Sequence, residues 1–180
     1  MCPARSIPAV LFLLSSLGGA NAGFAFEDDS FMATKAENSP EFQSSQASNV
    51  LAQIATALAE GNEAMRTLRG SPDEYDQKDR LQPSLPGMTC GIDRMLSYIS
   101  CYSAVINHEK EAENVFMQLV DDVKAALPSN RWRPVEVIPT LGSVRIISYE
   151  ERESGARIDI QVVGPVQNSY VISLYGWSRL

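Results

Sequence analysis

Residues 156–163 read ARIDIQVV, and this stretch decides the fold class. Its apolar residues alternate with polar ones: Ala156, Ile158, Ile160 and Val162 against Arg157, Asp159 and Gln161. Such alternation is typical of a β-strand that buries one face. Residues 144–150 and 170–177 have a similar strand-like composition, and Gly155 and Gly164 lie in the predicted turns. The pattern therefore predicts a three-stranded meander at the C-terminal end.

A helix and a further strand precede this meander. Residues 96–106 (LSYISCYSAVI) are aromatic, β-branched and small, and we expect a strand there. Residues 107–127 place apolar side chains at helical spacing, namely Ala112, Val115, Phe116, Leu119, Val120, Val123 and Leu127. We therefore predict an α+β domain over 90–180. It would be a mostly antiparallel four-stranded sheet, ordered strand, helix and three-stranded meander, with one helix packed on a face.

A separate amphipathic helix is expected in front of this domain, over residues 47–69. One stripe of it carries Leu51, Ile54, Leu58, Gly61, Met65 and Leu68. The stripe favours a core-facing helix, and the alternative is a homodimer formed through residues 51–68. Residues 70–89 contain three prolines and two glycines and are predicted to be a linker. Residues 23–46 are polar without a period, which predicts a flexible tail.

The first 22 residues have the pattern of an export signal. Arg5 precedes the run IPAVLFLLSSL at 7–17, which is too short to span a bilayer, and Ala20 and Ala22 supply the small residues of a cleavage site. We predict cleavage after Ala22; the alternative is an uncleaved N-terminal anchor. The mature chain would be secreted or periplasmic. It has no other apolar run for stable membrane insertion.

Cys90 and Cys101 would be the two cysteines of the mature chain, and we expect a disulfide between them because export leads to an oxidising compartment. On one straight helix, residues eleven positions apart would be roughly 16 Å apart, so a bridge requires the chain to fold back. The alternative is a pair of buried free thiols.

Charge and motifs exclude several classes of function. The net charge of −7 argues against nucleic acid as a partner. His108 begins the string HEKEA, but a zinc-protease helix needs a second histidine where Ala112 stands. Asp121 and Asp122 are adjacent, so on a helix their carboxylates diverge. We therefore assign no catalytic residue, no metal ligand and no cofactor.

The string QVVG at 161–164 resembles the Gln-Val-Val-Ala-Gly hairpin loop of cystatins, which are secreted inhibitors of papain-like proteases. The resemblance covers four residues, lacks one residue of that loop and lies in the last hairpin. It would imply a protease inhibitor with one helix over a meander. We do not assign the chain to the family on this basis.

We expect a binding surface on the sheet face opposite the helix at 107–127. The candidate residues are Tyr149, Arg157, Asp159, Gln161, Tyr175 and Trp177, with Trp132 as a second candidate in an arginine-flanked loop. Aromatic and arginine side chains are enriched where proteins bind partners. The alternative is that the helix at 47–69 covers this face.

The sequence thus predicts an exported, non-catalytic binding or interaction domain whose partner is an unknown protein or small ligand. Alternatives are a small secreted hydrolase or protease inhibitor of unrecognised type, and a structural component of a cell-surface assembly.

Overall fold

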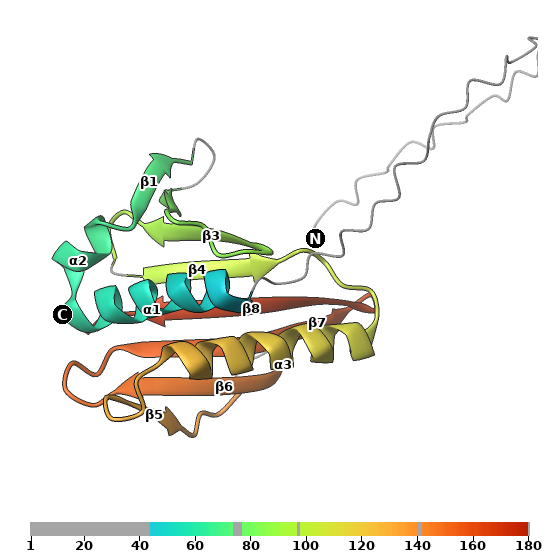
Figure 1. Cartoon of the computed structure of the whole chain (residues 1–180). Coiled ribbons are helices and arrows are strands. Elements are labelled where there is room, and N and C mark those ends of the chain that lie inside the picture. Colours follow the sequence, from blue (N-terminus) through green and yellow to red (C-terminus); the bar gives the residue numbers. More distant parts are fainter. Residues whose placement is uncertain (1–43, 74–76, 97, 140–141, 180) are drawn as a thin grey trace, which may run out of the picture. The chain divides into compact units, whose positions relative to one another are not determined.

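The computed structural model describes residues 44–73, 77–96, 98–139 and 142–179. The signal peptide expected at 1–22 and most of the tail expected at 23–46 lie outside these residues. The elements, in chain order, are α1 (Ser44–Glu60), α2 (Asn62–Arg66), β1 (Arg69–Pro72), β2 (Lys78–Leu81), β3 (Met88–Asp93), β4 (Tyr98–Ser103), α3 (Glu109–Ala126), β5 (Trp132–Val135), β6 (Ser143–Glu151), β7 (Arg157–Val166) and β8 (Ser169–Trp177) (Figure 1).

All eight strands form one antiparallel sheet in the order β1-β2-β3-β4-β8-β7-β6-β5. The prediction of a four-stranded sheet with one helix on a face is therefore wrong. The four expected strands are present as β4, β6, β7 and β8, and they form the middle of the sheet. Two further groups extend it, β1–β3 beside β4 and β5 beside β6.

The segment expected as a linker, residues 70–89, belongs to this sheet. It contributes most of β1, all of β2 and the start of β3. Its prolines and glycines lie mainly in the turns and at the strand ends. Leu81 and Leu85 of this segment nevertheless belong to the core, where both side chains are buried. A segment of this composition has no alternating pattern of its own, so it forms strands because adjacent strands pair with it.

Both long helices pack on the same face of the sheet, α1 beside α3 (Figure 1). The helix expected over 47–69 is thus neither separate from the domain nor placed on the opposite face. It is divided by Gly61, whose φ of 93° ends α1 and begins α2. Leu51, Ile54 and Leu58 of the predicted stripe are buried in the core of the single chain.

Every second side chain of the central strands points toward the helices and completes this core. Ile158, Ile160 and Val162 of β7 and Ile172 and Leu174 of β8 point toward the helices and are buried with Phe116 of α3. Gly176 continues the row on β8, and a Cβ there would lie 2.7 Å from Leu58 Cδ1, so α1 approaches the sheet backbone closely at this point.

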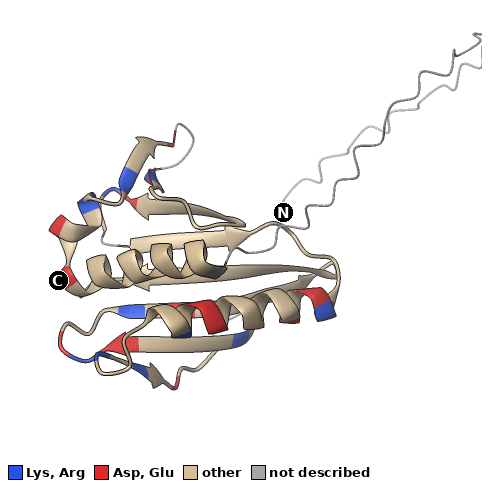
Figure 2. Ribbon diagram, in the orientation of Figure 1, with Lys and Arg blue, Asp and Glu red and all other residues tan. Residues whose placement is uncertain are grey.

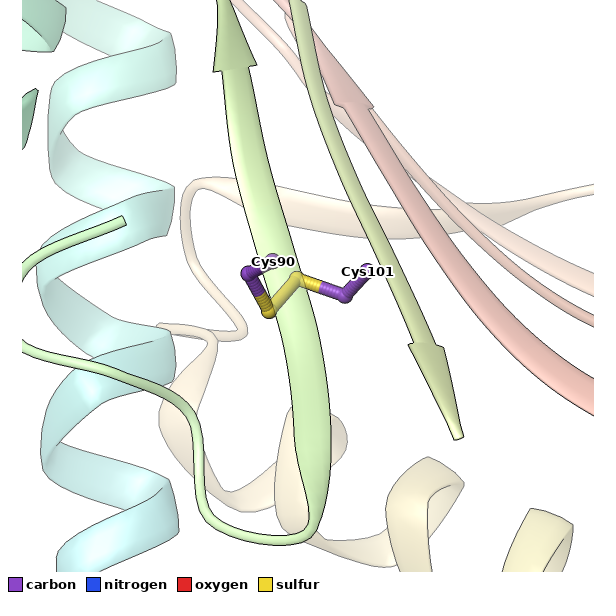
Figure 3. Close-up of a disulfide and its surroundings, with 2 residues drawn as sticks. All are labelled: Cys90 and Cys101. Atoms are coloured by element: carbon purple, nitrogen blue, oxygen red, sulfur yellow. A yellow bond between two sulfur atoms is a disulfide. The ribbon is translucent and has the colours of Figure 1, made fainter. Parts of the chain in front are cut away.

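Cys90 and Cys101 form the predicted disulfide, with the two sulfur atoms 2.05 Å apart (Figure 3). They are directly paired across β3 and β4, which run antiparallel on either side of a tight connection. The chain folds back between them, as the spacing required. Such a bond is typical of proteins in oxidising compartments, so it is consistent with an extracellular protein.

The outermost strands β1 and β5 have four residues each, and each contains a proline, Pro72 and Pro134. Within the described ranges, no helix is long and apolar enough to cross a membrane.

Candidate functional site

The sheet face away from the helices carries a mixture of aromatic and polar side chains, which we call the open face. Its central residues come from β4, β7 and β8, and pairing of these strands sets them side by side: Tyr98, Ser100, Tyr102, Arg157, Asp159, Gln161, Ser173, Tyr175 and Trp177. Ser148 and Glu150 of β6 continue the same rows. Both helices that contact the sheet lie on the other side.

Three tyrosines form an aromatic cluster in the middle of the open face. The Tyr98 and Tyr175 rings stack with their centroids 5.8 Å apart, and the Tyr102 ring meets Tyr175 edge-on at the same distance. Both arrangements are favourable for aromatic rings because each ring has a negative face and a positive edge. The side chains hold one another in place, so the cluster is a rigid apolar surface with phenol groups.

Arg157 joins this cluster to the polar part of the face. Its Nε donates to Asp159 Oδ1 at 2.9 Å, and its guanidinium lies 5.5 Å from the centre of the Trp177 ring. A carboxylate and an aromatic ring thus fix a long cationic side chain in one conformation. Its Nη2 also lies 3.5 Å from Ser148 Oγ, so the whole guanidinium group has a defined orientation.

The phenols of Tyr98 and Tyr175 remain protonated at neutral pH. Burial raises the pKa of Tyr98 well above its usual range, and the nearby Tyr175, Tyr102 and Asp159 raise it further. Burial also raises the pKa of Tyr175. These two groups therefore act as hydrogen-bond donors and acceptors, not as anions or general bases.

A hollow of about 90 Å³ adjoins the cluster between β2, β3 and β4. Gly91 forms part of its lining, where a Cβ would come within 3.0 Å of Lys78 Cδ. Ser100 is buried beside it, and its Oγ has no hydrogen-bond partner among the described groups. Tyr102 lines the same hollow and also belongs to the aromatic cluster, so the unpartnered Ser100 hydroxyl lies close to that cluster.

The structure brings five of the seven predicted residues together on the open face: Arg157, Asp159, Gln161, Tyr175 and Trp177. Tyr149 and Trp132 lie elsewhere. Tyr149 pairs with Ile158, so it shares the helix-covered side of the sheet, and Trp132 is buried opposite Glu151 at the outer strand.

The expectation that Tyr149 lies on the open face places β6 one residue out of register. Residues 144–147 (VRII) do not alternate cleanly, so the sequence pattern does not fix which face each of them occupies. In the structure Arg145 lies on the helix side, where it pairs with Glu113 and lies over the Phe116 ring at 5.1 Å. An arginine can lie on the helix-covered side of the sheet because its charged end reaches the rim of the helix layer. The sequence pattern of β6 does not reveal this.

Tyr98, Ser100 and Tyr102 were missed, although the strand that carries them was predicted. The signal was present in the alternation of these three with Ile99 and Cys101. It indicates one polar-aromatic face and one apolar face, as in β7. What the alternation could not indicate is that β4 pairs with β8, which places its tyrosines beside Tyr175.

The other candidates from the motif search do not converge on a site. His108 is exposed at the start of α3, and of the adjacent acids Asp121 is exposed while Asp122 is buried. Residues 161–164, which resemble the cystatin loop, lie within β7, where Gln161 and Val162 are buried. Among the described residues, no three His, Cys, Asp or Glu side chains are grouped to hold a metal ion.

Comparison of the chain with protein-family models, with curated proteins and with solved structures gives no significant match. The function is therefore inferred from the geometry of the open face.

Proposed function

We propose that this protein is an exported, non-catalytic binding module that recognises its partner through the open face. The observation that carries the proposal is the asymmetry of the sheet. One face is covered by α1 and α3, and the other presents Tyr98, Tyr102, Tyr175 and Trp177 with an oriented arginine.

This face has the properties of a recognition surface. Aromatic rings offer large contact areas with few rotatable bonds, and tyrosine adds a polar group at the end of each ring. Arg157 is already held by Asp159 and Trp177, so binding would restrict little additional motion. These features suit contacts with a protein or a small polar ligand.

Export of the protein is part of the proposal. The Cys90–Cys101 disulfide supports an oxidising compartment, and the apolar run at 7–17 supports a signal peptide. Secretion and delivery to a periplasm both agree with these features.

Site-specific photocrosslinking tests the proposal in the full chain. A benzophenone amino acid replaces Tyr102 on the open face or Met117 on α3, two side chains with the same exposed fraction of 37%. After irradiation of the protein in the extracytoplasmic fraction of its host, we expect a discrete adduct from position 102 and none from position 117. No adduct at 102, or the same adduct at both positions, contradicts the proposal.

Two alanine substitutions sharpen the test. Tyr175→Ala removes the ring at the centre of the cluster, and Arg157→Ala removes the oriented guanidinium. Each should reduce the yield of the adduct by about tenfold, the loss that accompanies removal of one strong interface contact. Circular dichroism would check that both variants keep the fold. Undiminished crosslinking in folded variants would show that another surface binds.

A further inference from the structure

Away from the open face, three arginines from different segments meet at one hollow of about 160 Å³. Arg66 comes from α2, Arg69 from β1 and Arg94 from the turn after β3, and Figure 2 shows basic positions on α2 and β1. The other described residues that line it are Asn62, Met95 and Leu96, so none of the described lining residues carries a carboxylate.

Two of the three arginines, Arg69 and Arg94, are held in place by hydrogen bonds to other groups. The Asp79 carboxylate receives Arg94 Nε on one oxygen at 2.9 Å and lies 3.5 Å from Arg69 Nη1 on the other. One acid thus serves two guanidinium groups. Backbone carbonyls accept further hydrogen bonds from these guanidinium groups. The Asp93 carbonyl, for example, accepts from Arg69 Nη2 at 3.0 Å.

At least one guanidinium donor among the arginines that line the hollow is unused. Arg69 is three-quarters buried, and its Nε is buried with no hydrogen-bond partner among the described residues. An unsatisfied N–H on a buried cation is unfavourable, so an acceptor oxygen bound beside it would stabilise it. Arg66 has one ion pair, to Glu63, whose side chain is 83% exposed, so this pair holds it weakly.

We propose that this hollow binds an oxyanion, the phosphate or carboxylate group of a ligand. Guanidinium groups recognise such groups because their planar N–H donors match paired oxygen atoms. Three arginines from different segments and Asn62 line the same hollow, and this set of donor side chains suits a group with several acceptor oxygens. The inference is independent of the open face and does not require the proposed function.

Titration calorimetry with inorganic phosphate and with acetate tests the proposal. Chloride keeps the ionic strength constant, so that general screening does not imitate binding. We expect saturable binding of at least one of the two anions by the full chain. Phosphate alone indicates a phosphate-bearing ligand, whereas binding of acetate indicates a carboxylate.

Arg66→Gln is the test variant, and Arg133→Gln is its matched control. Both arginines are exposed and each is paired with one glutamate, Arg66 with Glu63 at 2.7 Å and Arg133 with Glu150 at 2.8 Å. We expect Arg66→Gln to weaken binding about tenfold, and Arg133→Gln to leave it unchanged. Absence of saturable binding of both anions, or equal affinities in the two variants, overturns the proposal.

Discussion

At the scale of single residues, Glu151 is the clearest case of a charge that the fold requires. Its carboxylate is fully buried at the end of β6 and accepts from Arg131 Nε at 3.1 Å and from Ser154 N and Oγ at 2.6 and 2.8 Å. Burial alone would raise the pKa of Glu151, but these donors and the Glu153 N–H outweigh it and lower the pKa to about 2.

Glu151→Gln should therefore destabilise the protein by about 2 kcal/mol at pH 7, because the buried donors lose their charged acceptor. A carboxyl whose pKa is lower in the folded state stabilises the fold above its ordinary value of 4.5 and loses this effect as pH falls toward 2. Urea unfolding should show the difference from wild type shrinking over that range.

Glu153→Gln is the control for this prediction, since that side chain is exposed in the same turn. It should change the free energy of unfolding by less than about 0.5 kcal/mol. Equal effects of the two substitutions would refute the role given to Glu151.

Asp122 is the opposite case, a buried carboxyl without sufficient partners. Gln118 Nε2 donates to its Oδ1 at 3.2 Å, but its Oδ2 is unpartnered within the described part of the chain. Burial raises the pKa of Asp122, so its charge opposes folding increasingly as pH rises from its ordinary pKa through the folded value.

Asp122→Asn should stabilise the protein by about 1 kcal/mol at pH 7, because a buried charge disappears. The gain should vanish at a pH below both pKa values, where Asp122 is protonated in either state. Asp121→Asn makes the same chemical change on an exposed neighbour. Its charge contributes less than burial to the raised pKa of Asp122, so this variant should stabilise the protein less at pH 7. Thermal unfolding at two pH values measures both variants, and a loss of stability in Asp122→Asn would contradict the prediction.

At the scale of elements, the β7–β8 hairpin depends on a glycine near its turn. Gly164 has a φ of 134°, and a Cβ there would lie 2.6 Å from the carbonyl oxygen of Ser169. Both the backbone conformation and the available space exclude a side chain at this position.

Gly164→Ala should cost more than about 2 kcal/mol in the free energy of unfolding, since strain and a backbone clash add. Gly142→Ala separates the two causes, because Gly142 has a φ of 88° but, apart from its chain neighbours, no heavy atom of the described residues lies within 4 Å of its would-be Cβ. That substitution should cost only about 1 kcal/mol. Denaturant unfolding of both variants measures the two losses in the free energy of unfolding. Equal losses would show that the clash at Gly164 contributes nothing.

Elements with long periodic patterns could be predicted from the sequence, whereas short ones could not. The seven apolar positions of the expected helix gave α3, and the alternation at 156–163 gave β7. The strands β1, β2 and β5 have four residues each, too few for a period to emerge. Their positions at or near the edges of the sheet also permit prolines and charges that normally indicate loops.

At the scale of the whole molecule, the stripe on α1 correctly predicted burial but not the surface that buries it. An amphipathic pattern specifies which side of a helix is apolar, and nothing about its partner. The same limit applies to the candidate site. The residues of β7 and β8 could be assigned to one face. The cluster with Tyr98 and Tyr102, however, depends on pairing of β8 with β4, whose paired residues are about 75 positions apart in the sequence.

Because α1 completes the core, Leu58→Ala should destabilise the whole domain. Leu58 is fully buried against the sheet at Gly176, and truncation would leave a cavity worth about 3 kcal/mol. Thr56→Ala, on the exposed side of the same helix, should cost less than about 1 kcal/mol. A single cooperative transition that shifts only in Leu58→Ala confirms the integration of α1; no shift would show that the helix is dispensable.

The prolines of β1 and β5 have a consequence for how this protein can associate with others. A sheet normally grows when an incoming strand completes the backbone ladder at its edge, which is how fibrils and strand-exchanged dimers form. Here each border strand is short and contains a residue without an N–H, so neither border offers a continuous template. Lateral polymerisation is thereby discouraged at both ends. We therefore expect that other molecules do not associate with this sheet by adding a strand to either edge.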